Sequence, residues 1–160
     1  MEIEYLNDVK NYPSKYSTGY TATNKPITLI EILELEKKYN NGNYFPKSLR
    51  ELLFLAGNYC NVLDYGICKS QNELQELVKE NLEEENINLD KPFYIIDVYI
   101  AGTQFFFVYL DINDNPPVYE GIINFKDNKI EIKEISESLS KFLSHLIELE
   151  KEDIERRNQK

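Results

Sequence analysis

Apolar residues recur three and four positions apart in four stretches of the chain, and this spacing predicts four amphipathic helices. The helices are expected over about 28–40, 46–57, 70–82 and from about 138 into the C-terminal tail. Each of the first three carries a hydroxyl residue three positions before a glutamate, which is the pattern of a capping box at a helix start. The three pairs are Thr28 and Glu31, Ser48 and Glu51, and Ser70 and Glu73.

Between the third and the last helix the apolar pattern changes to a period of two, which predicts β-strands. Strands are expected over 93–100, 104–110, 118–125 and 129–135, with a further short strand near Val62–Ile67. The 104–110 strand is apolar on both faces, as a central strand would be.

Two of these strands make specific predictions about their faces. In the 93–100 strand, strict alternation places Tyr94, Ile96 and Val98 on one face and Asp97 on the other. In the 129–135 strand, Ile130 and Ile132 are expected to face inward, whereas Glu131 and Lys133 are expected to face outward.

Helices come first, then a run of strands, then one helix, and this segregation is typical of an α+β fold with an antiparallel sheet. A chain of 160 residues that is 42% hydrophobic has enough material for one core. We therefore expect a single α+β domain with an antiparallel β-sheet of about four to six strands and helices packed around it. Residues 1–26 are expected to form an N-terminal arm, 27–150 the domain, and 151–160 the helix end and tail.

The segment DINDNPPVYEG, residues 111–121, follows the most aromatic strand of the chain. Its spacing of Asp and Asn imitates the start of an EF-hand loop, but Pro116 occupies the position that requires glycine and Ile122 the position that requires a bidentate glutamate. No helix is predicted on either side. An EF-hand calcium site is therefore excluded, and the residues indicate a hairpin turn whose two prolines block further strand pairing.

Acids beside tyrosines in and around this turn form a candidate recognition surface, because tyrosine gives large contact area and acids give steering. A solvated turn remains the alternative for each residue. The residues that we predict to bind a partner are Asp64, Tyr65, Tyr109, Asp111, Asp114, Tyr119 and Glu120.

The formal net charge of −10 argues against nucleic acid or an anionic membrane as a direct partner, because both attract basic surfaces. It is consistent either with simple solubility or with a basic protein partner. The single histidine, His145, lies on a predicted helix without a nucleophile in reach, and the chain has no nucleophile elbow, metalloprotease or phosphate-loop motif. We expect a protein that is not an enzyme and that needs no cofactor or metal.

The N-terminus, MEIEYLND, lacks the basic start and apolar run of a signal peptide. The longest apolar stretch is interrupted by Asp97, Thr103 and Gln104, so it is expected to form two strands and not a membrane span. Cys60 and Cys68 have neither a disulfide framework nor zinc spacing. These features predict a cytoplasmic protein with reduced thiols.

The order of several motifs resembles the SUKH superfamily of bacterial, viral and yeast proteins. The resemblance covers about residues 27–150. It is carried by the helix at 30–36 followed by the proline-started helix at 44–53, by Tyr65-Gly66-Ile67 before a helix, and by the aromatic strand, acidic turn and Pro116-Pro117-Val118-Tyr119. Ala56-Gly57-Asn58 replaces the Asn-Gly-Gly that is frequent in the family, and tryptophan is absent.

This resemblance implies a binding domain and, in bacterial members, an immunity protein that neutralises a cognate toxin, often a nuclease, of a polymorphic or contact-dependent system. Nuclease toxins hold nucleic acid and tend to be basic, so the acidic chain agrees with such a partner. A regulatory or scaffold interaction domain without a toxin partner, as in the yeast members, is the alternative.

Overall fold

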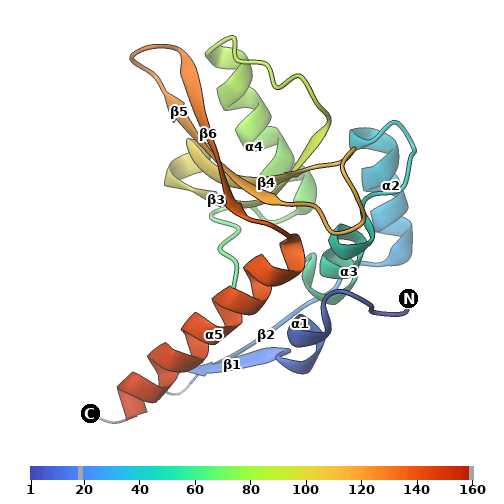
Figure 1. Cartoon of the computed structure of the whole chain (residues 1–160), viewed down its shortest axis with the longest axis vertical. Coiled ribbons are helices and arrows are strands. Elements are labelled where there is room, and N and C mark those ends of the chain that lie inside the picture. Colours follow the sequence, from blue (N-terminus) through green and yellow to red (C-terminus); the bar gives the residue numbers. More distant parts are fainter. Residues whose placement is uncertain (18–19, 159–160) are drawn as a thin grey trace.

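The computed structural model describes residues 1–17 and 20–158 of the chain (Figure 1). The helices are α1 (Asn7–Asn11), α2 (Leu29–Tyr39), α3 (Lys47–Ala56), α4 (Gln71–Glu84) and α5 (Leu139–Asn158). The strands are β1 (Ser14–Ser17), β2 (Tyr20–Thr23), β3 (Phe93–Tyr99), β4 (Gln104–Tyr109), β5 (Val118–Asn124) and β6 (Lys129–Ser136). A short 3₁₀ turn, η1 (Ile100–Gly102), joins β3 to β4.

The main sheet has four antiparallel strands in the order β3-β4-β5-β6, so each strand pairs with the next one along the chain. β1 and β2 form a separate two-stranded sheet. The architecture is a single α+β domain, as the segregation of helices and strands predicted. The four main strands and the four longer helices lie where the apolar periodicity placed them.

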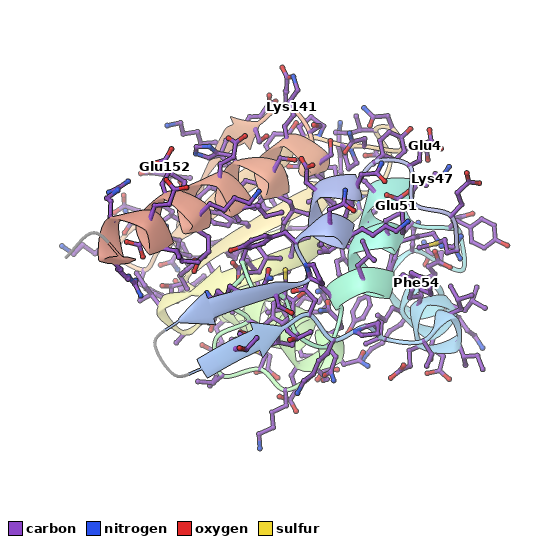
Figure 2. All side chains as sticks on the ribbon, turned by 90° about the horizontal axis from the view of Figure 1, so that it is seen from below. Glu4, Lys47, Glu51, Phe54, Lys141 and Glu152 are labelled. Carbon is purple, nitrogen blue, oxygen red and sulfur yellow. The ribbon has the colours of Figure 1, made fainter. Side chains whose placement is uncertain are left out.

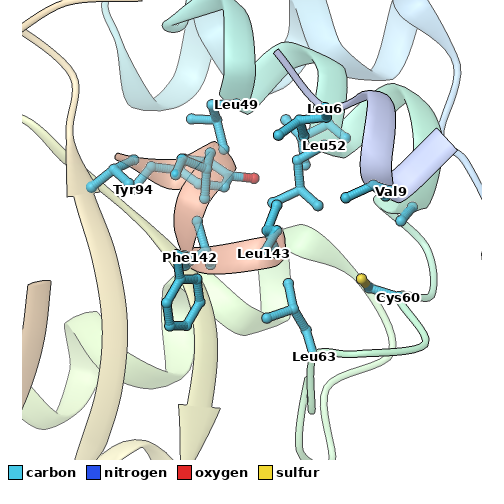
Figure 3. Packing of buried hydrophobic residues seen from close by; sticks show 14 of the residues in the cluster. Leu6, Val9, Leu49, Leu52, Cys60, Leu63, Tyr94, Phe142 and Leu143 are labelled. Atoms are coloured by element: carbon cyan, nitrogen blue, oxygen red, sulfur yellow. The ribbon is translucent and has the colours of Figure 1, made fainter. Parts of the chain in front are cut away.

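The two faces of the main sheet are covered by different helices. α4 packs on one face, where Leu74, Val78 and Leu82 meet Phe105 and Phe107. The opposite face packs against α1, α3 and α5, and this larger cluster contains Tyr94 of β3 (Figure 3). Removing such apolar side chains from water stabilises the fold by roughly 1.5–3 kcal/mol for each fully buried one.

The N-terminal segment belongs to the larger cluster, because Leu6 and Val9 around α1 are buried in it. Glu51 of α3 holds this segment in place and is 0% exposed. Its carboxylate accepts the backbone N–H groups of Glu4, Tyr5 and Leu6 at 2.8–2.9 Å. Figure 2 shows Glu4 and Glu51 close together near α1 and α3.

The interpretation of Ser48 and Glu51 as a capping box was therefore wrong. α3 begins at Lys47 with Pro46 at its N-cap, so Ser48 already lies inside the helix and does not cap it. The Thr28 and Glu31 box is confirmed, with both reciprocal hydrogen bonds present. In the third pair, Ser70 caps the backbone N–H of Glu73 at 3.2 Å.

Two strand predictions are also corrected. The segment Val62–Ile67 forms turns instead of a strand. β3 contains a bulge between Ile95 and Asp97, and the extra residue reverses the alternation after it. Val98 consequently packs in the α4 cluster with Ile95, whereas Asp97 turns to the face that carries Tyr94.

Gly121 of β5 lies directly opposite Phe105 of β4, and its missing side chain makes room for the aromatic ring. A Cβ at this position would lie 2.6 Å from the Cζ atom of Phe105, which is 0% exposed and cannot move into solvent. We expect Gly121→Ala to lower the free energy of unfolding by roughly 1–3 kcal/mol in urea denaturation. Because Phe105→Leu removes the clashing atoms, the double variant should lose less than the sum of the single losses. Additive losses would contradict this explanation.

Candidate functional site

The acidic turn after β4 is anchored by the starts of two helices. The carbonyl of Asp114 accepts the backbone N–H of Ser48 in the first turn of α3 at 2.9 Å. The carbonyl of Pro116 accepts the N–H of Leu139, the first residue of α5, at 2.8 Å. These N–H groups have no partner within their own helices, so the turn supplies acceptors that the helices need.

Asn115 adds side-chain bonds to the same anchor. Its Oδ1 accepts the N–H of Ser140 at 3.1 Å, and its Nδ2 donates to the Ser140 hydroxyl at 2.8 Å. Asn113 Oδ1 accepts the N–H of Asn115 at 2.7 Å, which closes a local turn. The expectation of a loop between two strands is confirmed, and the loop is held by backbone and amide groups. Its carboxylates remain available to solvent.

Residues 111–114 of this turn are all exposed, and among them are Asp111, Ile112 and Asp114, with Tyr44 beside them. Together Asp111, Ile112, Asp114 and Tyr44 form what we call the loop surface. They line part of a shallow cleft of about 480 Å³ with Pro46 and Leu110. The surface therefore combines two free carboxylates with an aromatic ring that is 70% exposed.

The ring of Tyr44 packs against the side chain of Arg50 of α3. The Arg50 guanidinium lies 4.6 Å from the centre of the Tyr44 ring. Its Nε is 2.9 Å from Oε1 of Glu36, a carboxylate on α2 that is almost completely buried. The same oxygen accepts the backbone N–H of Phe45 at 2.8 Å. This ion pair attaches the chain around Tyr44 to α2 and α3.

Tyr109 and Tyr119 lie side by side on β4 and β5, with their ring centres 5.0 Å apart. Both are half-buried on the α4 face of the sheet, where Tyr119 also stacks on Phe107. Burial raises the pKa of Tyr109 first, and the nearby charge of Asp111 raises it further. Tyr109 therefore lies close to Asp111 of the loop surface, and Tyr119 lies next to Tyr109.

A groove of about 340 Å³ lies beside Tyr109 on the same face. Its apolar walls come from Leu89, Ile130 and Ile132, and Lys91 lies 5.6 Å from the centre of the Tyr109 ring. α4 covers only part of this face, which leaves the outer strands accessible next to the tyrosine pair.

Glu120 is not part of this group. It pairs with Phe106 across the strands, which places it on the opposite face from Tyr119. Its carboxylate accepts a hydrogen bond from Gln104 Nε2 at 2.7 Å.

Asp64 and Tyr65 lie in the turn before α4, away from the loop surface. The Tyr65 hydroxyl donates to the carbonyl of Ala56 at 3.0 Å, and burial raises its pKa well above the ordinary value. Asp64 is exposed, and its carboxylate accepts the N–H of Gly66 at 2.9 Å. Tyr65 is thus used in packing, and only Asp64 of this pair presents a charge to solvent.

Asp97 is the residue that pattern reasoning did not select. It is 0% exposed, and its carboxylate accepts the N–H groups of Asp64 and Val98 and the hydroxyl of Tyr99 at 2.9–3.0 Å. Burial raises its pKa to about 7 even though these donors favour the charged form. The signal in the sequence was a single acid within an otherwise apolar strand.

Tyr99 also lines a cleft of about 290 Å³ between the sheet and α5. Lys15 of β1 and Glu150 of α5 form an ion pair at 3.5 Å in this cleft, beside Leu146 and Leu149. The cleft is therefore lined both by a charged pair and by aliphatic side chains of α5.

The remaining reactive side chains are one histidine and two cysteines. His145 is exposed on α5. Cys60 is buried, which raises its pKa to about 11, and Cys68 is half-buried, with neither in a disulfide. Among residues 1–17 and 20–158, no three His, Cys, Asp or Glu side chains gather into a metal-binding group. The same residues contain no helix with the length and apolar character needed to cross a membrane.

Comparisons with protein-family models, with curated proteins and with solved structures found no match for this chain.

Proposed function

We propose that the protein is an immunity protein that binds a cognate basic toxin, of the nuclease type, and neutralises it by occlusion. The observation that carries the proposal is the loop surface: two exposed carboxylates, Asp111 and Asp114, beside the exposed ring of Tyr44 on an anchored turn. The resemblance to the SUKH superfamily and the net charge of −10 support it.

Anchoring matters for affinity because a partner does not have to order the turn on binding. Ordering a loop costs free energy that would otherwise appear as binding. The bonds from Asp114 and Pro116 to the starts of α3 and α5 already fix the backbone of the turn. An aromatic ring on a fixed base supplies contact area, and the acids accelerate encounter with a basic surface.

Removing the two charges of the loop surface tests this role. We expect Asp111→Asn with Asp114→Asn to slow association with the basic toxin by about tenfold at low salt and to reduce the dependence of the rate on salt. Folding should be unaffected, because the bond from Asp114 to α3 uses the backbone carbonyl. Stopped-flow or biolayer kinetics at several salt concentrations would measure the rates.

A matched control removes two exposed charges elsewhere. Glu83→Gln with Glu84→Gln changes the net charge equally at the end of α4. If both double variants slow association to the same extent, the effect belongs to net charge and not to the loop surface.

The first experiment is capture of partners from the native host at low salt, elution at high salt, and assay of the eluted protein. A basic toxin whose activity is titrated to zero by one equivalent of this protein would support immunity. Recovery of a regulatory protein without toxic activity would instead favour the scaffold function.

A further inference from the structure

The two edge strands of the main sheet, β3 and β6, differ in how far their free backbone groups are blocked from pairing with another strand. At the β3 edge, the side chain of Gln75 accepts the N–H of Ile95 at 2.9 Å and donates to its carbonyl at 2.8 Å. A side-chain amide thus takes the place that a neighbouring strand would occupy. The bulge that follows Ile95 disrupts the same edge further. Such devices prevent pairing with another chain.

In the part of the chain that the structure describes, no side-chain amide covers the β6 edge in this way, and the bulge of β6 lies at its end, beyond residue 134, so residues 129–134 keep a regular register. β6 runs over Lys129–Ser136 without a proline, and among the described residues only β5 pairs with it. Four successive residues, 131–134, are exposed, so both faces are open there. Ile132 is 39% exposed, although alternation predicted that it would face inward. A long strand with an open edge is a template for a further strand.

The direction of the free backbone groups on β6 follows from the ladder. The N–H of Ile123 donates to the carbonyl of Thr103, which leads into β4. Because successive residues alternate in direction, Ile122 of β5 points toward β6, and its partner Glu131 points back toward β5. The residues that alternate with Glu131 and Lys133 therefore direct their N–H and C=O groups outward. These outward residues are Ile130, Ile132 and Glu134.

We propose that β6 pairs antiparallel with β6 of a second copy of this chain, with Ile132 opposite Ile132. Outward residues must face outward residues to exchange hydrogen bonds, which limits the possible registers. In this register, Glu131 of each copy lies opposite Lys133 of the other, and the two Ile132 side chains meet on the α4 face.

Neighbouring registers are unfavourable because they place like charges opposite each other. Pairing Ile130 with Ile132 would place Glu131 opposite Glu131, and pairing Ile132 with Glu134 would place Lys133 opposite Lys133. Opposite charges directly across strands stabilise a pair, and like charges destabilise it. The charge order of β6 is thus complementary to itself in one central register. This proposal does not depend on toxin binding, since it uses a different edge of the molecule.

Charge exchange tests the register directly. We expect the parent protein to dimerise in sedimentation equilibrium at concentrations up to about 1 mM. Glu131→Lys and Lys133→Glu should each raise the dissociation constant about tenfold or more, because symmetry converts both attractive pairs into repulsive ones. An equimolar mixture of the two variants should associate again, since one chain then presents two lysines and the other two glutamates. The variant with both substitutions should also self-associate.

The control is Glu148→Lys on the exposed surface of α5. It reduces the net negative charge by the same amount as Glu131→Lys and so weakens general repulsion between copies equally. It should not weaken dimerisation. A parent protein that stays monomeric throughout the range would overturn the proposal, as would a Glu131→Lys variant that dimerises like the parent. Failure of the mixed variants to associate, with circular dichroism showing both folded, would refute the register.

Discussion

Replacing Glu51 with alanine is expected to lower the free energy of unfolding by roughly 3–5 kcal/mol, because the variant leaves three backbone donors of the N-terminal segment without their partner. Those donors, Glu4, Tyr5 and Leu6, precede α1, which has no side-chain cap of its own. The carboxylate therefore holds the chain that leads into α1, including the N–H of its N-cap residue Leu6, and its negative charge also favours the positive end of α1.

The loss has a second source in packing. Leu6 and Val9 are 1% and 2% exposed, and both positions depend on the chain direction that Glu51 imposes. If the segment detaches, their burial is lost with it. Urea denaturation would measure the global effect, and hydrogen exchange at the amides of residues 4–9 would show whether the segment opens first.

Two further variants separate these contributions. Glu51→Gln keeps one acceptor oxygen and should cost only about 1–2 kcal/mol. Glu34→Ala removes an exposed glutamate from α2 and should change the stability by less than about 0.5 kcal/mol. A Glu51→Ala protein that matches Glu34→Ala in stability, with the N-terminal amides still protected, would show that the buried bonds contribute nothing net.

The same residue shows how far local pattern can be trusted. Thr28 with Glu31 and Ser48 with Glu51 have identical spacing. The first pair forms its box because both partners lie at the start of one helix. In the second pair the helix has already begun at Lys47, so Glu51 is free to bind a segment more than forty residues away in sequence. Periodicity and local spacing contain no information on such distant partners.

The strands likewise have some features that the sequence predicts and others that it does not. The existence and order of the four main strands followed from apolar alternation within each segment. The bulge in β3 could not be predicted from one strand, because it is defined by the residues of β4 that oppose it. Asp97 was therefore assigned to the wrong face of the sheet, and its burial was missed. Ile132 was expected inside because alternation does not report where the covering helix ends.

For the candidate site, sequence reasoning found the turn and the adjacent tyrosines but not their support. Acids and amides before Pro116 predict a turn from local dihedral preferences. That the carbonyl of Asp114 would meet α3, and that of Pro116 would meet α5, depends on the packing of helices distant in sequence. Pattern also joined Tyr119 to Glu120, although neighbouring residues of a strand face opposite sides.

The stability of the protein should fall as the pH rises from about 4 to 8, through the titration of Asp97. Its pKa is about 7 in the folded protein, against about 3.9 for an unfolded aspartate. Between these values the folded state holds a proton that the unfolded state has released. The contribution of Asp97 is therefore fully present below about pH 4 and is lost as the pH passes 7. The expected loss is roughly 4 kcal/mol.

Asp97→Asn isolates this contribution from the other carboxyl groups. The amide is neutral at every pH, so its burial does not become more costly as the solution becomes more alkaline. It cannot accept all three donors from Asp64, Val98 and Tyr99, so the variant should be less stable than the parent near pH 4. Between pH 4 and 8 the difference in unfolding free energy should shift by about 3–4 kcal/mol in favour of the variant.

Urea denaturation at unit steps of pH would give both curves, and Asp111→Asn, at an exposed carboxylate, serves as the control with the same charge change. If the parent and Asp97→Asn curves stay parallel over this range, the carboxyl of Asp97 releases its proton equally in the folded and unfolded states. The three donors would then compensate fully for burial, and Asp97 would connect β3 to the turn at Asp64 as a carboxylate whose ionisation does not change the stability. A converging or crossing pair of curves instead means that the fold retains a buried acid at a measurable cost in stability near neutral pH.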